Sequence, residues 1–175
     1  MSIPYLLASL PPLQFEEPAP LSQAEFLETC EVLPPGQHAI LENILNHQPG
    51  DFGVEAYRQY LDFKWGLDHE LVLLRARQLG LSELEVLSLE PFPEAPLPQA
   101  GDILNAHDPL EAEILRLHML WERVNLLEPA CLLNFSQLVL YTIKLSLIFR
   151  KDHFDPERGT QKLSQVLAQL SEGVL

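Results

Sequence analysis

Positively charged residues are scarce in this chain, and its first part has none. The sequence contains 11 lysines and arginines against 25 aspartates and glutamates, a formal net charge of −14 at pH 7. Arg58 is the first basic residue, and eight carboxylates precede it. A surface of this charge is repelled by nucleic-acid phosphates and anionic lipid head groups. The charge therefore argues against nucleic-acid binding and direct membrane docking. It indicates either solubility alone or an acidic face that meets a basic partner.

Cysteine is also rare. Cys30 and Cys131 are the only two in the chain, and they do not form a CxxC pair. A chain of 175 residues can bury enough apolar surface to fold without disulfides. We therefore expect two reduced, partly buried thiols, which suits a cytoplasmic protein.

The chain has no long apolar run at its start. The stretch YLLASL (5–10) lies between Pro4 and Pro11-Pro12 and has no basic residue near it. A secretory leader begins with positive charge, and a membrane-spanning helix needs about 20 apolar residues. We therefore expect this opening to stay in the mature protein as an extended arm packed against the core.

The remaining patterns predict an all-α, multi-helix bundle. Ser22 and Glu25 form a capping box that begins a helix ending at about Leu33, and a second helix is expected over about 37–47. Helical periodicity returns from Val54 to Gly80, with an interruption expected near Gly66. No alternating strand pattern or Asn-Gly hairpin turn is present.

A proline-rich stretch, PFPEAPLPQAGD, predicts a non-helical central connection. It divides the chain into an N-terminal helical part with the arm (1–89), the connection (90–102) and a C-terminal helical part (103–175). A short helix is expected in SELEVLSL (82–89), before the connection. Neither part has a comfortable core alone, so we expect the two to pack together.

The C-terminal part is expected to contain three helices. Asp108-Pro109 starts the first, Asn134 caps the second, and Asp155-Pro156 starts the last. The second, FSQLVLYTIKLSLIF (135–149), is apolar nearly all round, and Lys144 is its only charge. A helix without a polar face must be surrounded by protein or lipid, and this one has too many polar residues to span a membrane. It is predicted to be the central core helix, with one face covered by a partner protein as the alternative.

Motifs that carry catalysis or cofactor binding are missing. The chain has no GxxxxGK[ST] phosphate loop, GxGxxG turn, GxSxG elbow or HExxH helix. Its six histidines occur singly, without the paired spacing of zinc ligands; Glu111 and His118 lie two helical turns apart. No local group activates Cys30 as a nucleophile, and nearby carboxylates would raise its pKa. The sequence therefore predicts no catalytic, cofactor-binding or metal-binding residue, and a protein that is not itself an enzyme.

Four residues are candidates for contacts with a partner. Arg75 and Arg77, in LLRARQLG, lie two positions apart on a helix and so point in different directions. One is expected to pair with carboxylates and the other to face a partner. Trp121 and Arg123, in MLWERVNLLEP, are of residue types enriched in binding hot spots, although a core position for Trp121 is the simpler interpretation.

Three segments resemble a small bacterial family encoded with V-type (archaeal-type) ATPase subunits in chlamydiae, spirochaetes and relatives of Bacteroides. YLLASLPPLQF followed by LSQAEFLETC resembles the start of the family, and LVLLRARQLG resembles its Arg-rich, Gly-capped helix. The third segment, FSQLVLYTIKLSLIFRKDHFDPERGTQKLSQVL, resembles its C-terminal helix pair. Their shared order and spacing cover most of the chain. The departure is at Arg150-Lys151, where the family pattern leads us to expect an aromatic residue.

The resemblance implies a non-catalytic, C-subunit-like component of a V-type ATPase or ATP synthase. Such a component couples the central stalk to the membrane rotor ring or assists their assembly, and so supports ion transport. Its expected partners are the stalk and ring subunits, and its expected location is the cytoplasm, peripheral to the inner membrane through the complex. The alternative is a free-standing acidic helical adaptor or regulatory protein.

Overall fold

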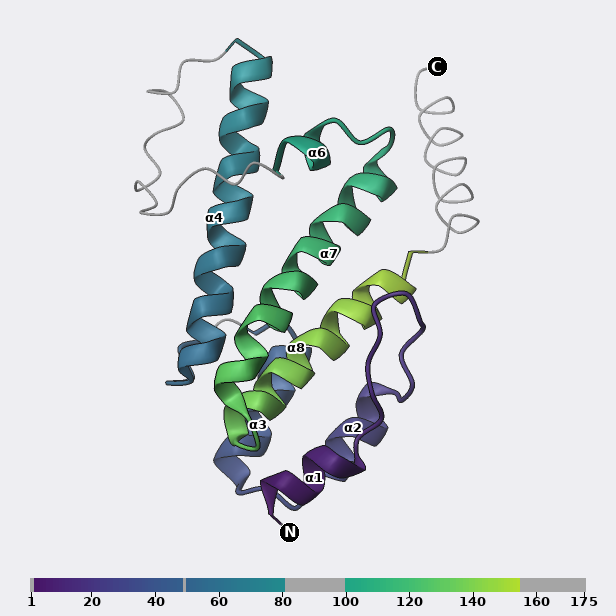
Figure 1. The fold of residues 1–175 in the computed structure, drawn as a ribbon, viewed down its shortest axis with the longest axis vertical. Helices are drawn as coiled ribbons and strands as arrows, with labels where there is room; N and C mark the ends of the chain where they lie inside the picture. The colour runs from purple at the N-terminus through teal and green to yellow at the C-terminus, as the bar shows by residue number, and fades with distance from the viewer. Residues whose placement is uncertain (1, 49, 81–99, 155–175) are drawn as a thin grey trace, which may run out of the picture.

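A computed structural model describes residues 2–48, 50–80 and 100–154 of the chain. Over these residues the regular structure is entirely helical, as predicted (Figure 1). Two long helices, α4 (Glu55–Gln78) and α7 (Pro109–Leu127), run beside each other. Both also contact α8 (Phe135–Asp152). Helix α3 (Pro35–Leu45) also packs on α8, so elements from both predicted parts of the chain share one core.

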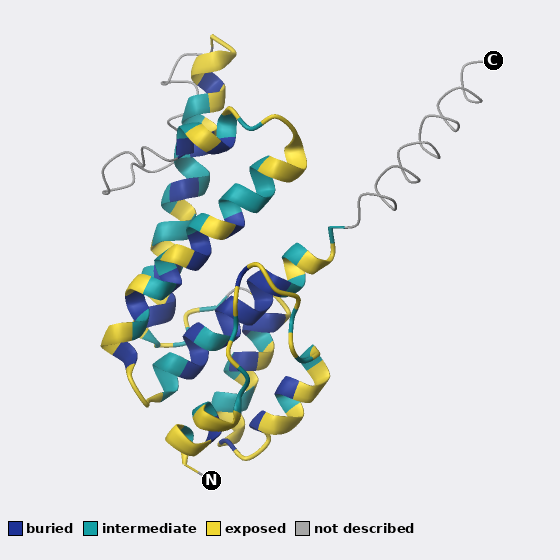
Figure 2. Cartoon of the chain, turned by 45° about the vertical axis from the view of Figure 1, so that its right-hand side comes forward, coloured by how far each residue is buried: buried dark blue, intermediate teal, exposed yellow. Residues whose placement is uncertain are grey.

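Helix α8 is the centre of this core, as its composition predicted. Its side chains from Leu138 to Ile148 are buried apart from Tyr141, which is half-buried. The buried hydroxyls bond to the helix backbone: Thr142 Oγ1 donates to the Leu138 carbonyl at 2.8 Å, and Ser146 Oγ donates to the Ile143 carbonyl at 2.8 Å. These local bonds lower the cost of burying polar groups, so the helix can be enclosed on all sides (Figure 2).

The buried charge of α8 has two partners. Lys144 Nζ lies 2.6 Å from Glu128 Oε1, in the short 3₁₀ helix η1 (Glu128–Cys131) that precedes α8. The same Nζ lies 4.8 Å from the centroid of the Trp121 ring, on α7. The ion pair and the cation–π contact together compensate for removing this side chain from water.

The prediction of an extended N-terminal arm is wrong for the first residues of the chain. Residues Ile3–Ser9 form a helix, α1, and Leu6 in it is fully buried. Pro4 lies in the first helical turn, where a missing backbone N–H breaks no hydrogen bond, so this proline starts a helix rather than preventing one. Between α1 and the next helix, the chain is non-helical from Leu10 to Ser22.

The predicted break near Gly66 is also wrong, because α4 continues through it. A glycine inside a helix costs only about 1 kcal/mol relative to alanine, and the burial of Leu67 and Leu71 beside it outweighs that cost. The helix ends at Gln78, and the expected Gly80 follows its C-cap residue with φ +69°, a left-handed conformation that glycine accepts without strain.

Two helix boundaries differ from the prediction. Helix α2 (Gln23–Cys30) begins with the predicted Ser22–Glu25 capping box but ends before Leu33. Helix α3 then begins at Pro35, two residues earlier than expected, because Pro34-Pro35 start this helix as well as ending the previous turn.

The proline-rich connection lies mostly outside the described residues, as do the short helix expected over 82–89 and the last predicted helix after residue 154. The last residues of the predicted connection are described, and they are helical. Ala100–Leu104 form helix α6, which packs on α4 and α7. Ala100 and Ile103 are buried there, and this apolar contact makes the segment helical.

Candidate functional site

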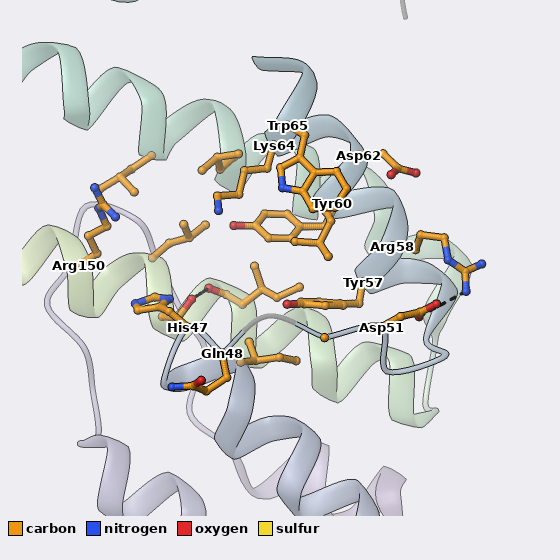
Figure 3. A pocket seen from close by; sticks show the side chains of 18 of the residues that line it. His47, Gln48, Asp51, Tyr57, Arg58, Tyr60, Asp62, Lys64, Trp65 and Arg150 are labelled. Atoms are coloured by element: carbon orange, nitrogen blue, oxygen red, sulfur yellow. Dashed lines mark hydrogen bonds and ion pairs between the residues drawn. The ribbon is translucent and has the colours of Figure 1, made fainter. Parts of the chain in front are cut away.

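A pocket of about 770 Å³ lies where the loop after α3 meets α4, α7 and α8 (Figure 3). The loop contributes His47, Gln48, Gly50 and Asp51, and α4 contributes most of the wall between Tyr57 and Trp65. Apolar side chains of α3, α7 and α8 form the rest of its lining: Ile44, Leu117, Leu120, Ile143 and Leu147. The pocket therefore combines an apolar base with a polar and aromatic wall.

The aromatic wall comes from one face of α4. Tyr57 and Tyr60 are buried with ring centroids 6.5 Å apart, and Phe52 lies 5.1 Å from the Tyr57 ring. Burial raises the pKa of both tyrosines, so their hydroxyls stay neutral donors and acceptors at physiological pH. Trp65, one helical turn further on, is 54% exposed and lies at the mouth.

Basic side chains gather at one end of the pocket. His47, Lys64 and Arg150 come from the loop, α4 and α8, and Figure 3 shows them around the same space as the Tyr60 hydroxyl. Arg150 forms an ion pair with Glu113, with 2.7 Å between Nη2 and Oε1. The half-buried Lys64 has no carboxylate within ion-pair distance among the described residues.

A second arginine, Arg116 of α7, lines the same pocket but is held by carboxylates. Its Nη2 and Nε atoms lie 2.6 and 2.9 Å from Asp68 Oδ1, and its Nη1 lies 3.6 Å from Glu113 Oε1. Glu113 therefore bridges Arg116 and Arg150, which ties α7 to α8 beside the pocket. The interaction fixes both guanidinium groups in place without leaving either unpaired.

At the outer edge of the pocket, the acidic side chain of Asp51 is held by contacts within the protein. The Asp51 carboxylate accepts a hydrogen bond from the Gly53 backbone N–H at 3.0 Å and lies 3.5 Å from Arg58. These two interactions, the backbone bond first, lower the pKa of Asp51. Arg58 also contacts Glu55 at 2.8 Å, so its charge is directed away from the pocket interior, as Figure 3 shows.

The pKa of His47 is lowered in the pocket. Burial lowers its pKa, and the positive charges of Arg150 and Lys64 lower it further. His47 has φ 54°, a conformation that histidine and asparagine adopt more readily than most residues. Its imidazole is therefore preferentially neutral in the folded protein.

Stability is expected to fall as the pH is lowered through the normal titration range of histidine. Because the folded state binds the His47 proton less readily than the unfolded state, this contribution is complete above about pH 6.5 and decreases as the pH falls below it. Urea unfolding between pH 7.5 and 5.5 measures the effect. His47→Asn, which tolerates the same backbone conformation, should show a shallower decline. An unchanged pH dependence in this variant would contradict the assignment to His47.

Among the residues that the structure describes, no three His, Cys, Asp or Glu side chains are placed to hold a metal ion. Burial, rather than the neighbouring carboxylates expected from the sequence, raises the pKa of the Cys30 thiol to about 11. Glu111 accepts a hydrogen bond from the His107 backbone at the start of α7, whereas His118 packs edge-on against Phe15 with ring centroids 5.1 Å apart.

The four partner candidates occupy different environments. Arg75 and Arg77 are both exposed in the last turn of α4. Trp121 is a core residue: it is buried, its ring centroid lies 5.7 Å from that of Phe15, and Lys144 covers its face. Arg123 is half-buried, with its guanidinium carbon 5.3 Å from the Phe63 ring centroid. Trp121 thus has the core position that was the simpler interpretation of its sequence context, and Arg123 packs within the bundle; contact of either residue with a partner stays a prediction.

Sequence reasoning missed the pocket. The signal available was the stretch YRQYLDFKW (57–65), which holds the first basic residues of the chain interleaved with aromatics. His47 and Arg150 lie too far away in sequence to be linked to this stretch without the structure.

Among the described helices, none combines the length and apolar character needed to cross a bilayer. Comparison with protein-family models, curated proteins and solved structures returned no match.

Proposed function

We propose that this protein is a non-catalytic subunit or assembly component of a V-type ATPase or ATP synthase. It would act on the cytoplasmic side of the inner membrane, attached to the complex, where it couples the central stalk to the membrane rotor and so supports ion transport. The resemblance of three sequence segments supports the association with an ATPase. The observation that carries an interaction role is the exposed face of α4.

This face is an apolar stripe with a heptad spacing. Trp65, Val72 and Leu79 lie seven residues apart, so they follow one another along the same side of the helix. They are 54%, 39% and 75% exposed. Arg75 is exposed between Val72 and Leu79, three positions after Val72, and so lies on the same side of the helix. We call these four residues the α4 stripe.

The partner that fits the α4 stripe is an amphipathic helix. Apolar residues every seven positions pack between the side chains of a second helix of similar periodicity, as in coiled coils. An acidic side chain on the partner would pair with Arg75. Arg75 belongs to the LLRARQLG segment of the resemblance, which implies a stalk or ring subunit as the partner.

The acidic N-terminal half supplies the second part of the proposed interaction. Its eight carboxylates before Arg58 include Glu16, Glu17, Glu28 and Glu31, which are exposed. Such a surface favours a basic region of a stalk or ring subunit and speeds association at low salt. Binding that depends on this surface should weaken with added salt.

The proposal predicts that the protein co-purifies with the ATPase from the native membrane. Replacing Val72 and Leu79 together by glutamine should reduce the amount recovered with the complex about tenfold or more. The expected loss follows because each apolar side chain buried in an interface contributes about 1.5–3 kcal/mol. Quantitative immunoblotting of purified complexes measures the recovery.

Leu126→Gln with Leu132→Gln is the control, since these leucines are also exposed, 74% and 67%, but lie at the opposite end of the bundle from Val72 and Leu79. This control should be recovered like the unaltered protein. Loss in the control alone would move the docking surface away from α4. Absence of the unaltered protein from both intact and partly assembled complexes would reject the ATPase proposal in favour of an independent adaptor.

A further inference from the structure

We propose that the pocket between the loop after α3 and helices α4, α7 and α8 binds an organic anion with an apolar body. The anionic head would lie near Lys64, Arg150 and His47, and the body would lie against Tyr60, Trp65 and the leucines of α7. This inference does not rest on the proposed ATPase role, because it concerns the isolated chain.

The charge balance at the basic end of the pocket supports an anionic ligand. Arg150 is paired with Glu113, and Arg116 is paired with Asp68 and Glu113, whereas Lys64 has no carboxylate partner among the described residues. In a chain of net charge −14, a half-buried lysine left unpaired beside two arginines is a local excess of positive charge. A bound anion would supply the missing counter-charge at a site partly removed from water.

The lowered pKa of His47 agrees with this arrangement. Burial is the first cause of the lowered pKa, and the two charged groups that add to it, Arg150 of α8 and Lys64 of α4, both repel a proton. A ligand anion at this end would oppose them and raise the pKa of His47. Divalent metal ions are poor candidates here because the same cations repel them.

Size and lining indicate the rest of the ligand. A volume of about 770 Å³ lies within the range of small-molecule sites, which are mostly apolar with a few placed polar groups. Leu117 and Leu120 form an apolar floor, and the half-exposed Trp65 offers an aromatic face at the mouth. This combination suits a carboxylate or phosphate head joined to an aromatic or aliphatic body.

The first test is a fluorescence titration with 1-anilinonaphthalene-8-sulfonate, an aromatic anion. We expect saturable binding at one site, and much weaker binding of N-phenyl-1-naphthylamine, which has the same rings without the charge. Lys64→Met and Arg150→Met should each weaken sulfonate binding about tenfold, the usual effect of removing one charge-assisted contact. Thermal unfolding of each variant checks that it remains folded.

Arg75→Met is the matched control. It removes one positive charge from the same helix but eleven residues beyond Lys64, about 16 Å along the axis at 1.5 Å per residue. Its affinity for the sulfonate should stay within about twofold of the unaltered protein, since exposed charges this far apart are largely screened. Equal affinity in Lys64→Met and Arg75→Met, or equal binding of the uncharged analogue, would overturn the proposal.

A gain of affinity is expected when the internal counter-ion is removed. Glu113→Gln frees the charge of Arg150, so a folded Glu113→Gln variant should bind the sulfonate several-fold more tightly. Proton NMR gives an independent readout: the His47 resonance, identified by its loss in His47→Asn, should titrate at higher pH with the sulfonate bound. Weaker binding by folded Glu113→Gln, or an unmoved His47 titration, would contradict the placement of the anionic head.

Competition distinguishes the sources of the natural anion. Laurate carries a carboxylate on an aliphatic chain, and ATP carries phosphates on an aromatic base. Displacement of the sulfonate by one of them at micromolar concentration identifies the class of head and body that the pocket prefers. If neither displaces it at millimolar concentration, the proposal of a carboxylate or phosphate ligand is rejected.

Discussion

Removing residues 2–13 is expected to destabilise the protein by at least about 2–5 kcal/mol, the usual cost of losing one buried leucine side chain. Leu6 is fully buried, and the segment also supplies the Pro11 carbonyl that accepts a 2.9 Å hydrogen bond from the Tyr141 hydroxyl. Tyr141 stacks in turn on Phe26, with ring centroids 5.8 Å apart. The deletion therefore uncovers part of α8 and removes a hydrogen bond of the Tyr141 side chain that stacks on Phe26 of α2. Urea unfolding followed by circular dichroism measures the change.

Leu6→Ala separates packing from chain length. It should reproduce most of the loss, whereas Tyr5→Ala, at a side chain 63% exposed, should leave stability within about 0.5 kcal/mol of the unaltered protein. A shortened chain that unfolds at the same urea concentration as the full chain would show that the first helix contributes nothing to the core.

The two tryptophans are expected to differ sharply on replacement by alanine. Trp121→Ala should cost about 3–5 kcal/mol of stability, because it removes a buried ring that contacts Phe15 and covers the Lys144 ammonium. Trp65→Ala should cost less than about 1 kcal/mol, since its ring is half exposed at the mouth of the pocket. Chemical unfolding of both variants under one set of conditions makes the comparison.

Binding measurements complete this contrast. Any loss of partner recovery in Trp121→Ala should follow from its unfolded fraction, and adding a mild stabilising osmolyte should restore recovery. Trp65→Ala should reduce both partner recovery and sulfonate affinity while remaining folded. A stably folded Trp121→Ala variant that no longer recovers the partner would show that Trp121 contacts the partner directly.

Trp65 connects the two proposals because it belongs to both features of α4. It begins the α4 stripe and also stands at the mouth of the pocket. A ligand in the pocket and a helix on the α4 stripe would therefore meet at one side chain. The variants Lys64→Met and Val72→Gln with Leu79→Gln separate them, since the first alters only the pocket and the second only the stripe.

Much of the helical framework follows from short-range sequence signals. The Ser22–Glu25 capping box, the Asp108 side chain that accepts from the Glu111 N–H, and the Asn134 cap before α8 all occur as predicted. Each is a contact between residues three positions apart, so the sequence contains both partners. The enclosure of α8 was predictable for a similar reason, because a helix with no polar face has to be covered.

Tertiary packing decided the features that short-range sequence signals do not determine. It made Ile3–Ser9 a helix by burying Leu6, carried α4 through Gly66, and placed Trp121 in the core while leaving Trp65 outside. It also formed the pocket, whose His47, Lys64 and Arg150 come from three elements separated by up to about a hundred residues. Local preference fixes helix starts because their energies depend on neighbours in the chain. Burial and charge pairing depend on which distant segments meet, and only the folded structure determines that.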